Sequence, residues 1–500
     1  MYKPAPPINP LQAFRGESKV ALALHPLEQT LLVIVGVLLC FTPWALGTMH
    51  VWSQFISLGL AMSGFVVALI NRNYSGEYAS ENEFKLIMWP KLIRFPIFWL
   101  GLAFLSYIVT QALNPAWILA INGQYAWLVP LDHITWLPAG IEAPLSRMNA
   151  WRALMIYGSA WLLVCALWVG ITRRATLQHL FTIVVINGTV LAIIGILQRG
   201  MGTDKILWCI ENVGGRSCFS TFIYKNHAGA YFNLVLMLAA ALSYWFFARG
   251  QRRMQRSNPA SVFAFCMMLL GGGVLLTHSK AATLLLIGFS IIAFLGFIAR
   301  YKSFHSDGNE HFMTIGTLCG IFILFVAVGS TQLDLGTAFE KTSQMIQQGS
   351  DADSVRSRLI AEEAAWDMAK GNLVTGWGAG GFRHMFPMYQ QNYPEIYYSH
   401  GNPNDHLYWE YAHNDYIQLL DELGLIGACL YLAMAVCGLI CLIKNGFYQS
   451  LHLLFIVLAL VVTLAHSWVD FISHNPAVLL LWCASAAVVC RWSELENRRV

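Results

Sequence analysis

The chain has 500 residues, of which 57% are hydrophobic and only 12% are charged, and its formal net charge is +4. Soluble domains carry about 25% charged residues, so this composition excludes an ordinary soluble enzyme and indicates a membrane protein. The positive charge lies largely in short connections between apolar runs, which is typical of a membrane-orientation signal and not of a nucleic-acid-binding surface.

Apolar runs of membrane-spanning length recur along the chain. A helix that crosses a bilayer needs about 20 mostly apolar residues. About twelve such runs predict an all-α polytopic membrane protein, at residues 30–47, 51–70, 95–112, 152–171, 180–197, 228–247, 261–277, 281–299, 313–329, 424–443, 451–468 and 476–491.

Lysine and arginine fall on alternate connections between these runs. Because short cytoplasmic loops retain these residues, the connections that carry Arg72 and Arg173 are predicted to be cytoplasmic, as are both termini. The pattern divides the chain into an N-terminal transmembrane region of about nine helices (1–329), a large, mostly helical extracytoplasmic loop (330–423) and a C-terminal transmembrane region of three helices (424–500).

Two shorter extracytoplasmic segments precede the large loop. Residues 113–151 are rich in Trp, Pro and Leu, which predicts an interfacial segment along the membrane surface, where Trp is favoured. In the second segment, Cys209 and Cys218 flank a Gly-Gly-Arg sequence that ends at Arg216. An oxidising compartment would permit a disulfide between these cysteines, and the sequence is equally compatible with two free thiols.

The large loop combines acidic residues with many aromatic side chains, which either hold sugar rings or pack together as a compact lid. A helix is predicted at 354–370, with Arg356 and Arg358 in its first turn. The helix dipole disfavours cations there, so these residues indicate a bound anion unless they are simply solvated. The glycine-rich stretch Gly376–Phe382 follows and predicts a backbone that bends tightly or approaches a ligand.

His413 joins this loop to a predicted membrane span. It directly precedes a helix that we expect to be capped by Asn414 or Asp415, with Tyr416 in the first turn. A histidine near the positive end of a helix tends to stay neutral, which suits a general base near pH 7. The alternative is a structural histidine bound to a loop carbonyl.

Cations are expected on the same side of the membrane as His413. Lys280 is the sharpest case, because it lies in His278-Ser279-Lys280 between two spans with almost no loop. A lysine so close to hydrocarbon is costly unless it is paired or reaches lipid head groups. A diphosphate at the membrane surface would supply the counter-charge. The full set of expected cations is Arg216, Lys225, Lys280, Arg356, Arg358 and Arg383.

Two further polar groups have other interpretations. His400, Asp405, His406 and His413 are spaced too irregularly for a compact zinc site, so no metal is expected. Near the last spans, His466, Asp470 and His474 are predicted either to pair with each other or to help orient a substrate.

The arrangement resembles the O-antigen ligase and polymerase superfamily. His413-Asn414, nine residues, Gly424, two residues and Gly427 are similar to its signature. Supporting similarities lie at Arg358, Gly376–Phe382 and the Phe219 to His227 element. The Ser279-Lys280 pair lies where many members have Ser-Arg, and this departure weakens the case for a bidentate phosphate contact at Lys280.

The resemblance implies a GT-C-like, metal-independent inverting glycosyltransferase without a cofactor, in the bacterial inner membrane with its active site facing the periplasm. The donor would be a glycan on undecaprenyl diphosphate, and the acceptor would be another glycan, a lipid A core or a protein serine. His413 maps to the catalytic base. Arg216, Lys280 and Arg358 map to the diphosphate site, where we also expect Arg356, while Asn414, Asp415, Lys225 and Tyr416 are expected to support the site.

Within this resemblance, the Phe222 to His227 element slightly favours a polymerase over a ligase or an oligosaccharyltransferase. The main alternative is a transporter or flippase for lipid-linked glycans, which would place ionisable groups near the middle of the membrane. A third is an assembly scaffold without catalysis.

Overall fold

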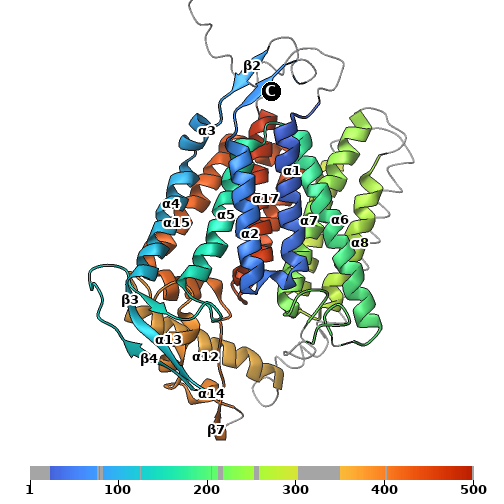
Figure 1. Ribbon diagram of the computed structural model, residues 1–500. Helices are drawn as coiled ribbons and strands as arrows, with labels where there is room; N and C mark the ends of the chain where they lie inside the picture. The colour runs from blue at the N-terminus through green and yellow to red at the C-terminus, as the bar shows by residue number, and fades with distance from the viewer. Residues whose placement is uncertain are drawn as a thin grey trace, which may run out of the picture.

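A computed structural model describes residues 23–75, 78, 83–123, 125–203, 205–211, 218–252, 258–301, 350–399 and 402–497. The molecule is mostly helical. Long helices run side by side in one bundle, short strands and helices lie beyond both of its ends, and the larger group of them surrounds α12 (Figure 1).

Helices cover every expected span that falls within these residues. The bundle consists of α1 (Pro26–Trp44), α2 (Val51–Leu69), α4 (Pro96–Leu113), α5 (Ala150–Gly170), α6 (Arg174–Gly200), α7 (Lys225–Arg252), α8 (Ala260–Leu276), α9 (Lys280–Tyr301), α15 (Asp415–Lys444), α16 (Leu451–Ser467) and α17 (Pro476–Asn497).

Eight of these helices are long and apolar enough to cross a membrane. The shorter apolar helices are Ala260–Leu276, Lys280–Ile292 and Leu451–Ser467. The expected span at 313–329 lies outside the described residues, so the total of about twelve stays a prediction.

The core of the bundle forms around α7, which packs against α6, α8, α9 and α16. Small residues permit the close approach of these helices. A Cβ atom on Gly188 of α6 would lie 2.8 Å from the Val235 side chain of α7, and one on Gly273 of α8 would lie 3.2 Å from the Cβ atom of Ala192. Substitution of either glycine would therefore push neighbouring helices apart.

The end of the bundle opposite α12 carries β1 (Arg72–Tyr74), β2 (Phe84–Leu86) and α3 (Trp89–Ile93). Glu28 is fully buried there. It accepts hydrogen bonds from Arg72 Nη1 at 3.2 Å, Thr172 N at 3.0 Å and Arg173 N at 3.2 Å. Two arginines that the charge pattern assigns to one side of the membrane therefore meet at one end of the bundle.

The α12 end includes a three-stranded sheet between α4 and α5. β3 (Pro115–Asn122) pairs antiparallel with β4 (Tyr125–Pro130) and parallel with β5 (Gly140–Glu142). The chain is mostly helical, as expected, but not all-α, because the segment 113–151 forms these strands, and its hairpin extends beyond the bundle (Figure 1). The interfacial position of this segment stays a prediction. The sequence holds one signal for the hairpin, since Asn122-Gly123 is a strong hairpin turn and Gly123 has a positive φ of 63°.

A second, smaller core lies beneath the bundle. It includes α12 (Ser350–Gly371), α13 (Phe382–Gln390) and α14 (Pro394–Tyr397), followed by the paired strands β6 (Tyr398–Ser399) and β7 (Asn402–His406). The helix expected at 354–370 is confirmed, with a start four residues earlier. Apolar side chains of α12 and α13 pack with residues of the sheet, and this core consists of Ile141, Ala361, Ala364, Ala365, Met368, Phe382, Met385, Phe386, Ile396 and Ala412.

The glycine-rich stretch locks this small core to α15. Gly424 interrupts α15 with φ 61° and ψ −170°, a conformation that is essentially restricted to glycine. The backbone of this stretch and of the residues just before it pairs with α15 on both sides of the break. Trp377 N donates to Asp421 O at 2.7 Å, and Leu425 N donates to Leu373 O at 2.8 Å. The predicted tight approach is therefore made to protein backbone.

The described residues also form three short 3-10 helices, η1 (Leu46–Thr48), η4 (Phe447–Gln449) and η5 (Ile472–His474). Cys209 carries a free thiol, so the disulfide considered with Cys218 is not formed in this structure.

Candidate functional site

His413 occupies a strained position at the start of α15. Its φ is 56°, in the left-handed region that non-glycine residues rarely adopt. Asn414 caps the helix, as expected, by accepting hydrogen bonds from Tyr416 N at 3.0 Å and Ile417 N at 3.3 Å. The turn before the cap thus fixes the direction of the His413 side chain, which is about one-fifth exposed at 21%.

Asp470 faces His413 from the connection between α16 and α17. His413 Nδ1 lies 3.3 Å from Asp470 Oδ1, and the carboxylate is 1% exposed. Phe471 N donates to the same carboxylate oxygen at 2.9 Å, while the Asn226 amide and the Tyr224 hydroxyl approach Oδ2. The His413 contact is longer than an ordinary hydrogen bond and is an ion-pair contact only.

The environment of Asp470 favours its charged form. Burial opposes ionisation, but the neighbouring His413 lowers the pKa of Asp470 below its usual value. Asp470 is therefore ionised at neutral pH, and its position in front of Nδ1 favours the His413 tautomer that carries its proton on that nitrogen.

A cluster of rings surrounds the pair. Phe471 stacks with Tyr411 at 4.1 Å between ring centroids and with Tyr224 at 5.1 Å. The His413 ring meets the edge or face of Phe471 at 4.9 Å and of Trp409 at 5.5 Å. These contacts hold the imidazole on two sides, while its Nδ1 faces Asp470.

A second ion pair ties the same two segments together. His474 Nδ1 lies 2.8 Å from Asp415 Oδ1, and Ser473 N donates to Asp415 Oδ2 at 2.8 Å. Burial opposes protonation of His474, but the hydrogen bond and charge of Asp415 raise its pKa above the usual value. Of His466, Asp470 and His474, which were expected to pair with each other or to orient a substrate, Asp470 and His474 each contact the His413–Asp415 segment. A role in orienting a substrate stays a prediction.

Four cations gather beside this site and are called the Lys280 cluster: Arg199, Lys225, Lys280 and Arg358. The charges of the other three act on Lys225. Lys225 and Lys280 are the first residues of α7 and α9, and Arg199 lies at the end of α6, where its Nε donates to Leu276 O at 3.3 Å. The positive ends of two helices therefore reinforce the positive side chains.

Arg358 connects the cluster to Asp470. It donates to Val469 O at 3.4 Å and lies beside the Tyr224 hydroxyl. Glu362, one turn further along α12, accepts a 3.4 Å hydrogen bond from the Asn414 amide. Burial raises the pKa of Glu362 above its usual value, and the opposing effects of Asn414, Arg358 and His413 only partly offset this shift.

The expected residues do not all join the site. Lys225, Lys280 and Arg358 come together, whereas Arg356 is exposed on α12. Arg216 falls outside the described residues. Tyr416 is at the surface of α15 and donates to Leu464 O at 2.9 Å, which anchors α15 to α16.

Several residues of the site were not assigned to it from sequence: Asp470 as the partner of His413, and Arg199, Tyr224 and Glu362. For Arg199 the signal was its place at the exit of an apolar run, in the same segment as other cations. The part of the chain that the structure describes holds no group of three or more His, Cys, Asp or Glu residues able to bind a metal ion.

A protein-family model matches part of the chain. The model of a family described as O-antigen ligase matches residues 263–432, a range that includes Lys280, Arg358 and His413. No curated protein matches the chain.

Proposed function

Residues 263–432 match the model of the O-antigen ligase family, as the resemblance indicated, and on this premise we propose that the protein is a glycosyltransferase of polysaccharide assembly. It moves a glycan from undecaprenyl diphosphate to an acceptor hydroxyl on the periplasmic face of the bacterial inner membrane. The reaction is a single inverting displacement without a metal ion, as in a polysaccharide polymerase or an O-antigen ligase.

The observation that carries the proposal is the His413–Asp470 pair beside the Lys280 cluster. A base and a group of cations are what transfer from a diphosphate requires. The charge of Asp470, 3.3 Å from His413 Nδ1, favours the proton on that nitrogen, and this leaves the Nε2 lone pair free to accept the proton of the acceptor hydroxyl. The negative charge of Asp470 also stabilises the imidazolium that forms.

In the displacement, the acceptor oxygen forms a bond to the anomeric carbon of the donor while the bond from that carbon to the diphosphate oxygen breaks. The electron pair of the broken bond leaves with the diphosphate, which therefore gains negative charge. Lys225, Lys280, Arg199 and Arg358 supply positive charge for it, and the N-termini of α7 and α9 add backbone N–H groups. No proton has to be delivered to this leaving group.

The proposal is tested with the purified protein and a lipid-linked repeat unit. Elongation of this substrate alone identifies a polymerase, and product that forms only after addition of a lipid A core identifies a ligase. Product that forms only with a serine-containing acceptor protein identifies an oligosaccharyltransferase. A transporter or flippase would move the lipid-linked glycan across a vesicle membrane without a new glycosidic bond, and that result would contradict the proposal.

A further inference from the structure

A second group of cations lies on another side of the aromatic cluster around Phe471 and is called the Arg383 cluster: Arg147, Arg152 and Arg383. The Arg383 guanidinium lies 4.9 Å from the centre of the Tyr411 ring, and its Nη1 is 3.6 Å from Glu410 Oε1. The charge of Arg383 acts on Arg152, and both Arg383 and Arg147 act on His384.

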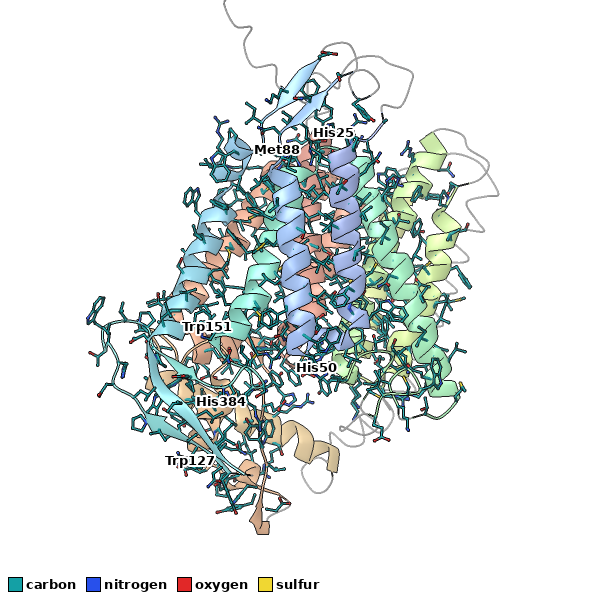
Figure 2. All side chains as sticks on the ribbon, viewed as in Figure 1. His25, His50, Met88, Trp127, Trp151 and His384 are labelled. Carbon is teal, nitrogen blue, oxygen red and sulfur yellow. The ribbon has the colours of Figure 1, made fainter. Side chains whose placement is uncertain are left out.

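The Arg383 cluster lies where the helices of the bundle begin. Arg152 is in the first turn of α5, and its guanidinium donates to Gln54 Oε1 at 3.0 Å and to Met49 O at 2.8 Å at the start of α2. Trp151 and His384 are seen at this same end of the bundle, opposite His25 and Met88 (Figure 2). A phosphate at the membrane surface would lie at this depth.

The Phe471 ring lies between His413 and an aromatic residue beside each cation cluster. On one path, Arg383 covers Tyr411, which stacks on Phe471 at 4.1 Å. On the other path, Arg358 lies beside Tyr224, which stacks on Phe471 at 5.1 Å. Phe471 itself contacts the His413 ring at 4.9 Å. One cluster of rings therefore contacts the proposed base and both groups of positive charge.

The charges of the Arg383 cluster are incompletely balanced by the contacts described. Glu410 pairs with Arg383 and its side chain is half exposed, at 50%. Arg152 is only 8% exposed, and the Arg383 side chain is 13% exposed. Arg152 donates to two neutral oxygens, Gln54 Oε1 and Met49 O, so neither of these bonds supplies a counter-charge. The planar guanidinium group matches phosphate oxygens in a bidentate manner.

We propose that the Arg383 cluster binds the phosphate-bearing head group of a lipid acceptor, while the Lys280 cluster binds the diphosphate of the donor. This inference rests on the proposed function and deepens it, because it makes the acceptor an anionic lipid. Two sources share this chemistry: a second polyprenyl-diphosphate-linked glycan, or the phosphorylated lipid A core. In either case the head group anchors the acceptor so that its hydroxyl reaches His413 Nε2.

The test is lipid binding to the purified full-length protein by native mass spectrometry, with undecaprenyl diphosphate and lipid A as separate probes. Three variants are compared with the wild type: Arg147→Gln, Arg383→Gln and Lys280→Gln. Lys205→Gln is the matched control, because Lys205 is an exposed cation near the end of α6 that pairs only loosely with exposed Glu211 at 3.5 Å.

We expect the wild type to bind either two undecaprenyl diphosphates or one of them together with one lipid A. Lys280→Gln should weaken only the donor site. Arg383→Gln and Arg147→Gln should weaken only the acceptor site, by about 10-fold or more, because each removes a charged hydrogen bond to phosphate. Lys205→Gln should match the wild type. The lipid whose binding is lost identifies the source of the acceptor.

Unchanged binding of both lipids by Arg147→Gln and Arg383→Gln would overturn the inference while leaving the proposed function intact. The exposed Arg147 variant keeps this result informative if Arg383→Gln folds poorly. Wild-type protein that binds no undecaprenyl diphosphate and transfers no glycan would instead overturn the proposed function.

Discussion

Replacement of Gly424 by alanine should destabilise the protein because this residue joins α15 to the small core under the bundle. Its φ of 61° and ψ of −170° are essentially inaccessible to other residues and would cost about 1–3 kcal/mol. An added Cβ atom would lie 2.6 Å from Gly376 N and would also collide with the Val374 carbonyl oxygen. Both obstacles are backbone atoms, so no side-chain rotation relieves them.

To remove these collisions, the glycine-rich stretch and the residues just before it would have to move away from α15. That movement breaks the bonds from Leu425 N to Leu373 O at 2.8 Å and from Ile426 N to Val374 O at 3.2 Å. Each bond contributes about 0.5–1.5 kcal/mol. With the backbone strain, the loss in free energy of unfolding is therefore about 2–6 kcal/mol.

The measurement is thermal unfolding of the purified protein, followed by tryptophan fluorescence, together with limited proteolysis of the 372–424 region. Gly59→Ala is the matched control, because Gly59 lies in α2 with no atom within 4 Å of an added Cβ. Alanine should stabilise a helix there by about 0.5–1 kcal/mol. If Gly424→Ala unfolds at the same temperature as Gly59→Ala, the glycine-rich stretch does not hold α15 as described.

Three further substitutions separate the roles of the site residues. Asp470→Asn keeps the side-chain shape but removes the charge that orients His413, so transfer should slow by about 10²–10⁴-fold; a wild-type initial rate would exclude this role. Lys280→Ala and Arg358→Ala should weaken the use of donor more than of acceptor in steady-state kinetics, and equal losses would count against diphosphate binding. His474→Gln should remove the pair with Asp415. Because the folded-state pKa of His474 is raised, its stabilisation is fully present below the unfolded value of 6.5 and is lost as pH rises through the raised value. The difference in unfolding temperature from the wild type should therefore shrink from about pH 5.5 to pH 9, and a constant difference would refute the ion pair.

Local sequence signals predicted the part of the site that local backbone determines. Asn414 accepts from the first N–H groups of α15, as its residue type and position indicated. The helix around Arg358 also follows from local preference, and the spans follow from apolar length. Each of these features depends on residues close together in the chain.

The partner of His413 depends on tertiary packing. Asp470 is 57 positions later, and it meets His413 only because α15, α16 and α17 bring the two connections together. Nothing in the sequence indicated that Phe471 belongs to the site, although four rings contact it in the structure. For the β3–β4 hairpin the sequence did contain a local signal, the pair Asn122-Gly123. The many Trp and Pro residues of the segment drew attention to its position at the membrane surface instead of to its strands.

The most direct test of the proposed chemistry is glycan transfer by His413→Ala. The His413 ring contacts Asp470, Trp409 and Phe471 at the edge of the site, so its removal leaves the buried cores intact. The variant should insert and unfold like the wild type but form no polymer or ligated product from a lipid-linked repeat unit. Wild-type amounts of product from this variant would contradict the assignment of His413 as the base.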